Sequence, residues 1–162
     1  MADGTHARTT ETEASMSEES RPTVFYEADE EVEEVLRRFE SGALRPAEFK
    51  HRQHLTVALL YLLRLPEQEV HARMRDTILR FLARHRLGAG VYHETITAFW
   101  LRRVRSFVRG ADTRRPVHEL ANELINRCAD SRLVFEYFSH ELIETKEARA
   151  GWVEPDLKAL DF

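Results

Sequence analysis

Two short segments of the chain hold side chains that could bind a metal ion or transfer protons. The first contains Glu48, His51 and His54, each three residues after the last. On one helix this spacing would place a carboxylate and two imidazoles within about two turns on neighbouring faces. Imidazole and carboxylate groups arranged in this way suit a transition metal held inside a helical bundle. We therefore predict all three residues as metal ligands.

The second segment runs from Tyr92 to Thr97 and directly follows a glycine-containing stretch. His93 is expected to share a helix face with Thr97 and Trp100, and so to point along the buried stripe. Glu94 would be turned about 100° away from it. We predict His93 as a further metal ligand and Glu94 as a ligand or general base, with Tyr92 and Thr97 orienting water or substrate.

One site forms if the helices that carry these two segments pack together. His51, His54 and His93 would then converge on zinc, iron or manganese, with a carboxylate or water completing the ligand set. Two or three imidazoles beside a carboxylate could also do acid–base work without metal. A di-iron carboxylate bundle needs two Glu-x-x-His segments, and Glu48–His51 is the single one here, which argues against a dinuclear centre. The first interpretation is thus an enzyme of unknown reaction that uses a divalent metal.

Two other functions stay open from the sequence. In one, the same pocket binds an anionic or polar small molecule, or a protein partner, and the histidines serve only as hydrogen-bond donors. In the other, an arginine-rich face binds nucleic acid. Its support is a run between Val70 and Arg115 that carries three acidic residues and eleven arginines, at positions 73, 75, 80, 84, 86, 102, 103, 105, 109, 114 and 115. A purely structural role is open too, because buried histidines often donate to a backbone carbonyl.

Remaining candidates for chemistry have weaker support. Glu136 and His140 are four residues apart, which is a usable ligand spacing, but an exposed pair on a helix explains them more simply. Cys128 is the single cysteine, so it can form no internal disulfide and is expected to act as a small core residue. The sequence contains no glycine-rich phosphate loop and no Gly-x-Ser-x-Gly motif.

Apolar residues at helical spacing predict the elements that would position these groups. The composition is 43% hydrophobic and 32% charged, with few glycines and prolines, which favours helices over a turn-rich β fold. The first helix ends at Ser41, and the others cover roughly residues 46–65, 67–87, 92–108, 116–128 and 133–145. The sequence thus predicts an all-α fold, an antiparallel bundle of five or six helices, with Trp152 and Leu157 anchoring the C-terminal segment.

The chain divides into an N-terminal tail and one folded domain. Residues 1–23 are rich in Thr, Ser, Glu and Ala and lack apolar periodicity, which predicts a disordered acidic tail. Residues 24–162 are expected to form a single helical domain. No apolar run approaches the roughly 18 residues of a membrane span, and no secretion signal is seen, so we expect a cytoplasmic protein that does not use a membrane.

Three runs of residues resemble a family of small, all-helical bacterial proteins. They are the F-x-H-x-x-H-L pattern that opens Phe49–Leu62, the Y-H-E-T-I-T motif within Tyr92–Trp100, and the closing segment Ala148–Leu157. The resemblance covers roughly Phe39 to the C-terminus and implies a shared architecture and the same pocket. The family has no assigned activity, so the resemblance implies no reaction. The long acidic N-terminal tail departs from the family pattern.

Overall fold

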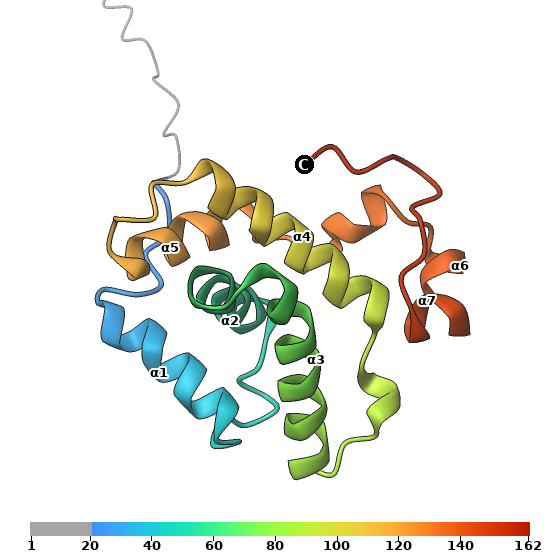
Figure 1. The fold of residues 1–162 in the computed structure, drawn as a ribbon, viewed down its shortest axis with the longest axis horizontal. Coiled ribbons are helices and arrows are strands. Elements are labelled where there is room, and N and C mark those ends of the chain that lie inside the picture. The colour runs from blue at the N-terminus through green and yellow to red at the C-terminus, as the bar shows by residue number, and fades with distance from the viewer. Residues whose placement is uncertain (1–20) are drawn as a thin grey trace, which may run out of the picture.

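Helices make up the regular secondary structure of this protein in the computed structural model, which describes residues 21–162 (Figure 1). No strand occurs in that range, so the predicted all-α class is confirmed. The longer helices are α1 (Asp29–Glu40), α2 (His51–Arg64), α3 (Glu67–Arg84), α4 (Glu94–Gly110) and α5 (Val117–Arg127). The short ones are η1 (Ala89–Val91), η2 (Ser131–Glu136), α6 (His140–Ile143) and α7 (Lys146–Ala150). The predicted acidic tail falls mainly on residues 1–20, which lie outside the described residues.

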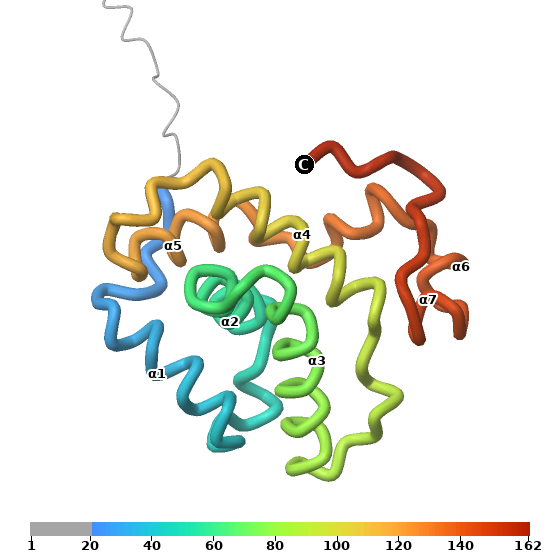
Figure 2. Tube along the Cα trace, viewed as in Figure 1, coloured from blue at the N-terminus to red at the C-terminus, as the bar shows by residue number. Residues whose placement is uncertain are grey.

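Helix α2 lies at the centre and contacts α1, α3, α4 and α5. In Figures 1 and 2 it is seen nearly end-on, whereas α1, α3 and α4 run across the view. Seven consecutive residues, Leu55–Tyr61, are buried, as expected for a helix that is apolar on all faces. The neighbours therefore cross a central helix. This arrangement does not confirm an antiparallel bundle of five or six helices.

Helix α2 begins at His51, five residues later than the predicted start at Pro46. Glu48 stands before the helix, where its carboxylate accepts a hydrogen bond from the backbone N–H of Arg45 at 2.9 Å. Lys50, the residue directly before the helix, has an extended backbone, with φ −97° and ψ 178°. Because Glu48 is outside the helix, its spacing from His51 does not place the two side chains on one helical face.

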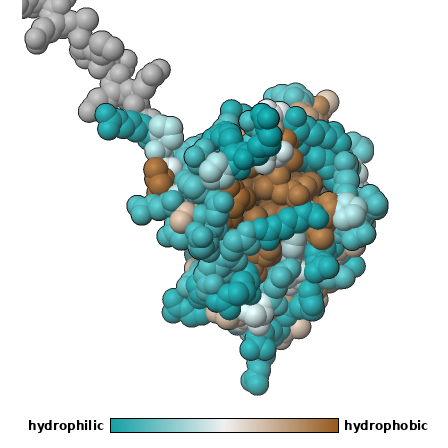
Figure 3. All heavy atoms as spheres, turned by 60° about the vertical axis from the view of Figure 1, so that its left-hand side comes forward, coloured by the Kyte–Doolittle hydropathy of each residue, from teal (hydrophilic) through white to brown (hydrophobic). Residues whose placement is uncertain are grey.

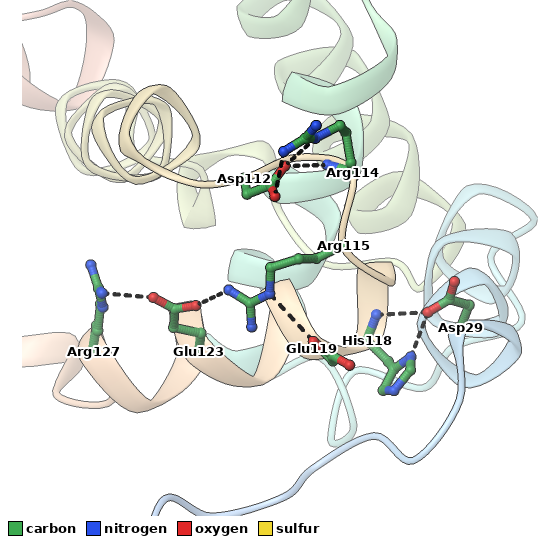
Figure 4. Close-up of polar contacts among 8 residues, drawn as sticks. All are labelled: Asp29, Asp112, Arg114, Arg115, His118, Glu119, Glu123 and Arg127. Atoms are coloured by element: carbon green, nitrogen blue, oxygen red, sulfur yellow. Dashed lines mark hydrogen bonds and ion pairs between the residues drawn. The ribbon is translucent and has the colours of Figure 1, made fainter.

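The N-terminal part of the described chain is fixed to α5 by polar contacts. Asp29 Oδ1 accepts hydrogen bonds from the backbone N–H of His118 at 2.9 Å and from its Nδ1 at 2.6 Å (Figure 4). These bonds hold the pKa of Asp29 below its ordinary value. Thr23 and Asn126 also exchange two hydrogen bonds, of 2.9 and 2.8 Å. Thr23, one residue before the predicted start of the domain at residue 24, thus already contacts the folded domain.

A second, smaller core lies beside the C-terminal end of the chain. It is centred on Phe99 of α4 and on Phe138, both fully buried. Trp152 packs edge-on against Phe138, with ring centroids 5.8 Å apart, so its predicted anchoring role is confirmed. Leu157 is 58% exposed, so the same prediction for its side chain is wrong. The backbone N–H of Leu157, rather than its side chain, holds the segment by donating to the carbonyl oxygen of Tyr137 at 3.0 Å.

The helix predicted over residues 133–145 is divided into η2 and α6, and α7 follows. The divisions fall at hydroxyl side chains that cap new helices. Ser139 Oγ accepts from the backbone N–H of Leu142 at 3.1 Å, and Thr145 Oγ1 accepts from that of Ala148 at 3.1 Å. Such caps favour a helix start over continuation of the preceding turn, which apolar periodicity alone does not reveal.

The molecular surface is mainly hydrophilic on the face drawn in Figure 3, where apolar surface gathers in a central depression. Large apolar side chains are exposed in residues 21–162 at Val24, Leu87, Val91 and Leu157. Two of these four, Leu87 and Val91, belong to the connection between α3 and α4. No helix in the described part of the chain is both long and apolar enough to cross a membrane.

Candidate ligand-binding cavity

A cavity of about 480 Å³ lies between α2, α3, η1, α4 and η2. This volume is within the range of roughly 300 to 1,000 Å³ that is usual for small-molecule sites. Its wall is mostly apolar and holds the aromatic residues Phe49, Phe81, Tyr92, Trp100 and Phe135. Its polar residues are His51, His54, His93, Thr97 and Ser131. Within the described part of the chain, no Asp, Glu, Lys or Arg side chain lines it.

The two predicted segments do meet at this cavity. His51 and His54 from the start of α2, and Tyr92, His93 and Thr97 from the start of α4, all line it. The packing of α2 against α4 brings them together. The three imidazoles nevertheless differ in how many of their ring nitrogens already have a hydrogen-bond partner.

His93 uses both of its ring nitrogens inside the protein. Nε2 donates to the carbonyl oxygen of Ile143 at 2.8 Å, and Nδ1 accepts from the backbone N–H of Ile96 at 3.3 Å. The second bond caps the N-terminus of α4. His93 is also buried, with 8% of its surface exposed. A metal ion or a ligand would have to displace one of these bonds, so the geometry gives His93 a structural role.

His51 and His54 each keep one ring nitrogen open. His51 Nε2 donates to the carbonyl oxygen of Cys128 at 2.8 Å, and His54 Nδ1 donates to that of Lys50 at 3.0 Å. A carbonyl oxygen can only accept, so these two nitrogens must carry the protons. In the neutral ring the other nitrogen, His51 Nδ1 or His54 Nε2, is then a bare acceptor. Neither has a hydrogen-bond partner within residues 21–162.

Burial keeps both of these imidazoles neutral. It lowers the pKa of His54 to about 4, and it also lowers the pKa of His51. Both rings are held in place by aromatic neighbours. His54 stacks on Phe49 with centroids 3.8 Å apart, and His51 packs edge-on against Trp100 at 4.4 Å. Both histidines line the cavity, and their unpartnered nitrogens are acceptors, contrary to the expectation that they would serve as donors to an anionic ligand.

Glu94 lies outside the cavity, although we predicted it as a catalytic group there. Its Oε2 accepts from the hydroxyl of Tyr92 at 2.7 Å, and its Oε1 lies 2.6 Å from His71 Nε2. Arg75 approaches Oε2 at 3.7 Å. Burial and the bond to Glu94 raise the pKa of Tyr92, so the phenol stays protonated. The carboxylate therefore interacts with Tyr92, His71 and Arg75 and not with the cavity histidines.

Glu48 does not line this cavity, although His51 and His54 do. Its carboxylate pairs with Arg45 at 2.9 Å and with Arg38 at 3.0 Å, and these contacts lower its pKa to about 2. No group of three or more His, Cys, Asp and Glu side chains in the described residues is arranged to hold a metal ion. The four-ligand centre predicted from Glu48, His51, His54 and His93 is therefore not assembled in this structure.

Sequence reasoning missed the side of the cavity that η2 forms. Ser131, Val134 and Phe135 line it, and the sequence offered no motif or spacing that marks them. Glu136 and His140 do not form the expected pair on one helix, because they belong to η2 and α6. His140 instead stacks on Phe135 with centroids 3.8 Å apart.

Most arginines of the basic central run are committed to contacts within the protein. Two stack on aromatic rings, Arg102 on Trp152 and Arg103 on Phe162. Six form ion pairs with acidic residues, and two of these six are drawn in Figure 4; they are Arg73, Arg75, Arg105, Arg109, Arg114 and Arg115. Six of the eleven arginines thus have their charge paired with a carboxylate, which leaves less positive charge for a phosphate backbone.

Comparisons of the chain with protein-family models, with curated proteins and with solved structures give no match. The resemblance to a bacterial family therefore stays a prediction. Any function must be argued from the cavity itself.

Proposed function

We propose that this protein binds a small, uncharged, largely apolar molecule in the cavity between α2, α3 and α4. One observation carries the proposal: two neutral imidazoles, His51 and His54, line a mostly apolar cavity of about 480 Å³, and each has one ring nitrogen without a partner in residues 21–162. A few fixed polar groups in an apolar wall are typical of small-molecule sites. The two nitrogens would orient the ligand, and the wall would supply the hydrophobic contribution to affinity.

The absence of charge from the cavity wall argues for an uncharged ligand. Burying an unpaired charge in an apolar site is very unfavourable, and no lining side chain could pair with one. The carboxylates of Glu48 and Glu94 are held by other partners, and Asp130, which interacts electrostatically with His51, is paired with Arg132. An anion would in addition meet two hydrogen-bond acceptors. The hypothesis of an anionic ligand is thus disfavoured.

A neutral fluorescent dye, N-phenyl-1-naphthylamine, tests the proposal because its emission rises when it enters an apolar site. Ala58 lines the cavity and is buried, so Ala58→Leu would fill part of the space. Ala72 is exposed on α3 and does not line the cavity, which makes Ala72→Leu the matched control. We expect saturable one-to-one binding to wild type and Ala72→Leu, and at least roughly tenfold weaker binding to Ala58→Leu.

Two results would overturn the proposal: no saturable binding to the wild-type protein, or equal affinity of Ala58→Leu for the dye. Circular dichroism and a thermal midpoint must show that Ala58→Leu is folded. If that variant does not fold, Thr97→Leu fills the same cavity from α4 and replaces it in the comparison.

Proton transfer within the cavity is a second candidate function. His51 has the orientation of a general base, because a carbonyl oxygen fixes one ring nitrogen and leaves the other open. An uncharged ester that releases a chromophore, such as 4-nitrophenyl butyrate, would report hydrolysis. Turnover in the wild type that falls at least tenfold in both His51→Gln and His54→Gln would support this function. Equal rates in all three proteins would rule it out.

A metal-dependent reaction has weaker support from the geometry. Among residues 21–162, His51 and His54 alone combine a place in the cavity wall with an unpartnered ring nitrogen, whereas catalytic zinc usually has three protein ligands. A zinc, iron or manganese ion would therefore rely on water or substrate for its remaining ligands. Elemental analysis of the untagged protein beside His51→Ala tests this. Stoichiometric metal in the wild type, lost in the folded variant, would restore the metal-dependent interpretation.

A further inference from the structure

The two bare nitrogens at the cavity define which polar group a ligand can offer. Each is the unprotonated edge of a ring whose other nitrogen donates to a backbone carbonyl, of Cys128 for His51 and of Lys50 for His54. These bonds also prevent the rings from turning to present an N–H. A hydroxyl or N–H on the ligand would complete the hydrogen bond that each nitrogen lacks within residues 21–162. A ligand carbonyl or ether oxygen would face a second acceptor instead.

The rings around these nitrogens define the body of the ligand. Phe49 is stacked between Phe39 and His54, with ring centroids 4.2 and 3.8 Å away, so its edge rather than its faces is left for a ligand. Its ring centroid lies 5.0 Å from that of Phe81. Trp100 packs edge-on against His51, and Phe135 lies in the part of the wall that η2 contributes. Flat aromatic surfaces favour offset-stacked or edge-to-face contacts with another ring. A planar aromatic body would therefore use this wall better than a flexible alkyl chain.

We infer that the cavity takes an uncharged aromatic compound that carries one hydroxyl or N–H donor, of the chemical class of phenols, naphthols and indoles. The inference rests on the proposed function and adds the ligand class to it. The donor binds His54 Nε2 or His51 Nδ1, and the ring lies among the aromatic side chains of the wall. Selectivity comes from the acceptors, because a ligand without a donor leaves them unpaired in an apolar site.

Two probes of nearly the same shape test the inference. 2-Naphthol has a hydroxyl where 2-methylnaphthalene has a methyl group, so the pair differs in the donor and hardly in volume. The methyl compound is the more hydrophobic, so apolar burial alone would favour it. Calorimetric titration of the wild-type protein at pH 7 should nevertheless give an affinity about tenfold higher for 2-naphthol.

The variant His54→Phe removes one acceptor and keeps an aromatic ring at the same place. Its preference for 2-naphthol should fall at least about threefold, while its affinity for 2-methylnaphthalene should change little. Equal binding of the two probes to wild type, or preference for 2-methylnaphthalene, would refute the ligand class while leaving the cavity's binding function intact. Binding of neither probe, together with no dye binding, would overturn both proposals. The wild-type comparison decides the matter even if His54→Phe does not fold.

Discussion

His93 Nε2 donates to the carbonyl oxygen of Ile143 at 2.8 Å, across fifty residues of sequence. The bond joins the first residue before α4 to the last residue of α6. The other ring nitrogen, Nδ1, caps α4 by accepting a hydrogen bond from the backbone N–H of Ile96. One imidazole thus fixes both the beginning of α4 and the position of the C-terminal helices, which places it among the residues that hold the cavity wall together.

Replacing His93 should therefore cost stability. We expect His93→Ala to lower the free energy of unfolding by about 2 to 3 kcal/mol, since it removes a helix cap and leaves the Ile143 carbonyl unpaired. Urea denaturation followed by circular dichroism measures this. His140→Ala is the control, because that ring is exposed, and its effect should stay below about 1 kcal/mol. A loss as small in His93→Ala as in the control would contradict the structural role.

Stability should also depend on pH in a window set by the cavity histidines. The pKa of His54 in the folded protein is lowered from 6.5 to about 4, so the unfolded chain binds more protons between these values. Stability is then full above about pH 6.5 and falls as the pH drops toward 4. Glu48, whose pKa is lowered from 4.5 to about 2, changes stability only below about pH 4.5.

Urea denaturation at several pH values between 7 and 4.5 tests this dependence. The slope in that range should be smaller in His54→Phe than in wild type. The lowered pKa of His51 adds to the same slope, so a part of it should persist in the variant. Identical slopes in the two proteins would show that His54 is not held neutral by the fold.

Glu94 is expected to matter for stability and not for ligand binding. It accepts from Tyr92 and pairs with His71, with 13% of its side chain exposed. Glu94→Gln should lower the free energy of unfolding by about 1 to 3 kcal/mol, because His71 and Arg75 lose their charged partner. Affinity for N-phenyl-1-naphthylamine should stay within about twofold of wild type. A large loss of dye binding in folded Glu94→Gln would show that the carboxylate takes part in ligand binding.

Gly42 holds the turn after α1 in a conformation that side chains resist. Its φ is +73°, and an added Cβ would clash with Cδ of Arg84. We expect Gly42→Ala to lose about 1 to 2 kcal/mol from the left-handed backbone, and more from displacement of Arg84. Thermal unfolding should show partial recovery in Gly42→Ala combined with Arg84→Ala. Gly88→Ala meets no atom within 4 Å and should change stability little.

Local sequence patterns determined the helices and part of the cavity. Apolar spacing indicated α1 to α5, because a helix buries residues that recur every three to four positions. The motifs around His51 and Tyr92 drew attention because polar side chains interrupt otherwise apolar stripes, and both do line the cavity. Helix starts were less well predicted: Glu48 was assigned to α2, yet its carboxylate binds the Arg45 backbone before the helix begins.

Only the tertiary structure decided what each histidine can do. The sequence does not distinguish the roles of His51, His54 and His93. Two of their four hydrogen-bond partners, the carbonyl groups of Cys128 and Ile143, come from distant segments, and the other two are local. Sequence spacing cannot show which ring nitrogen meets such a partner, because that depends on how helices far apart in the chain pack. Those contacts leave two acceptors open, commit His93 to the fold, and thereby favour an uncharged ligand over the metal centre that spacing alone suggested.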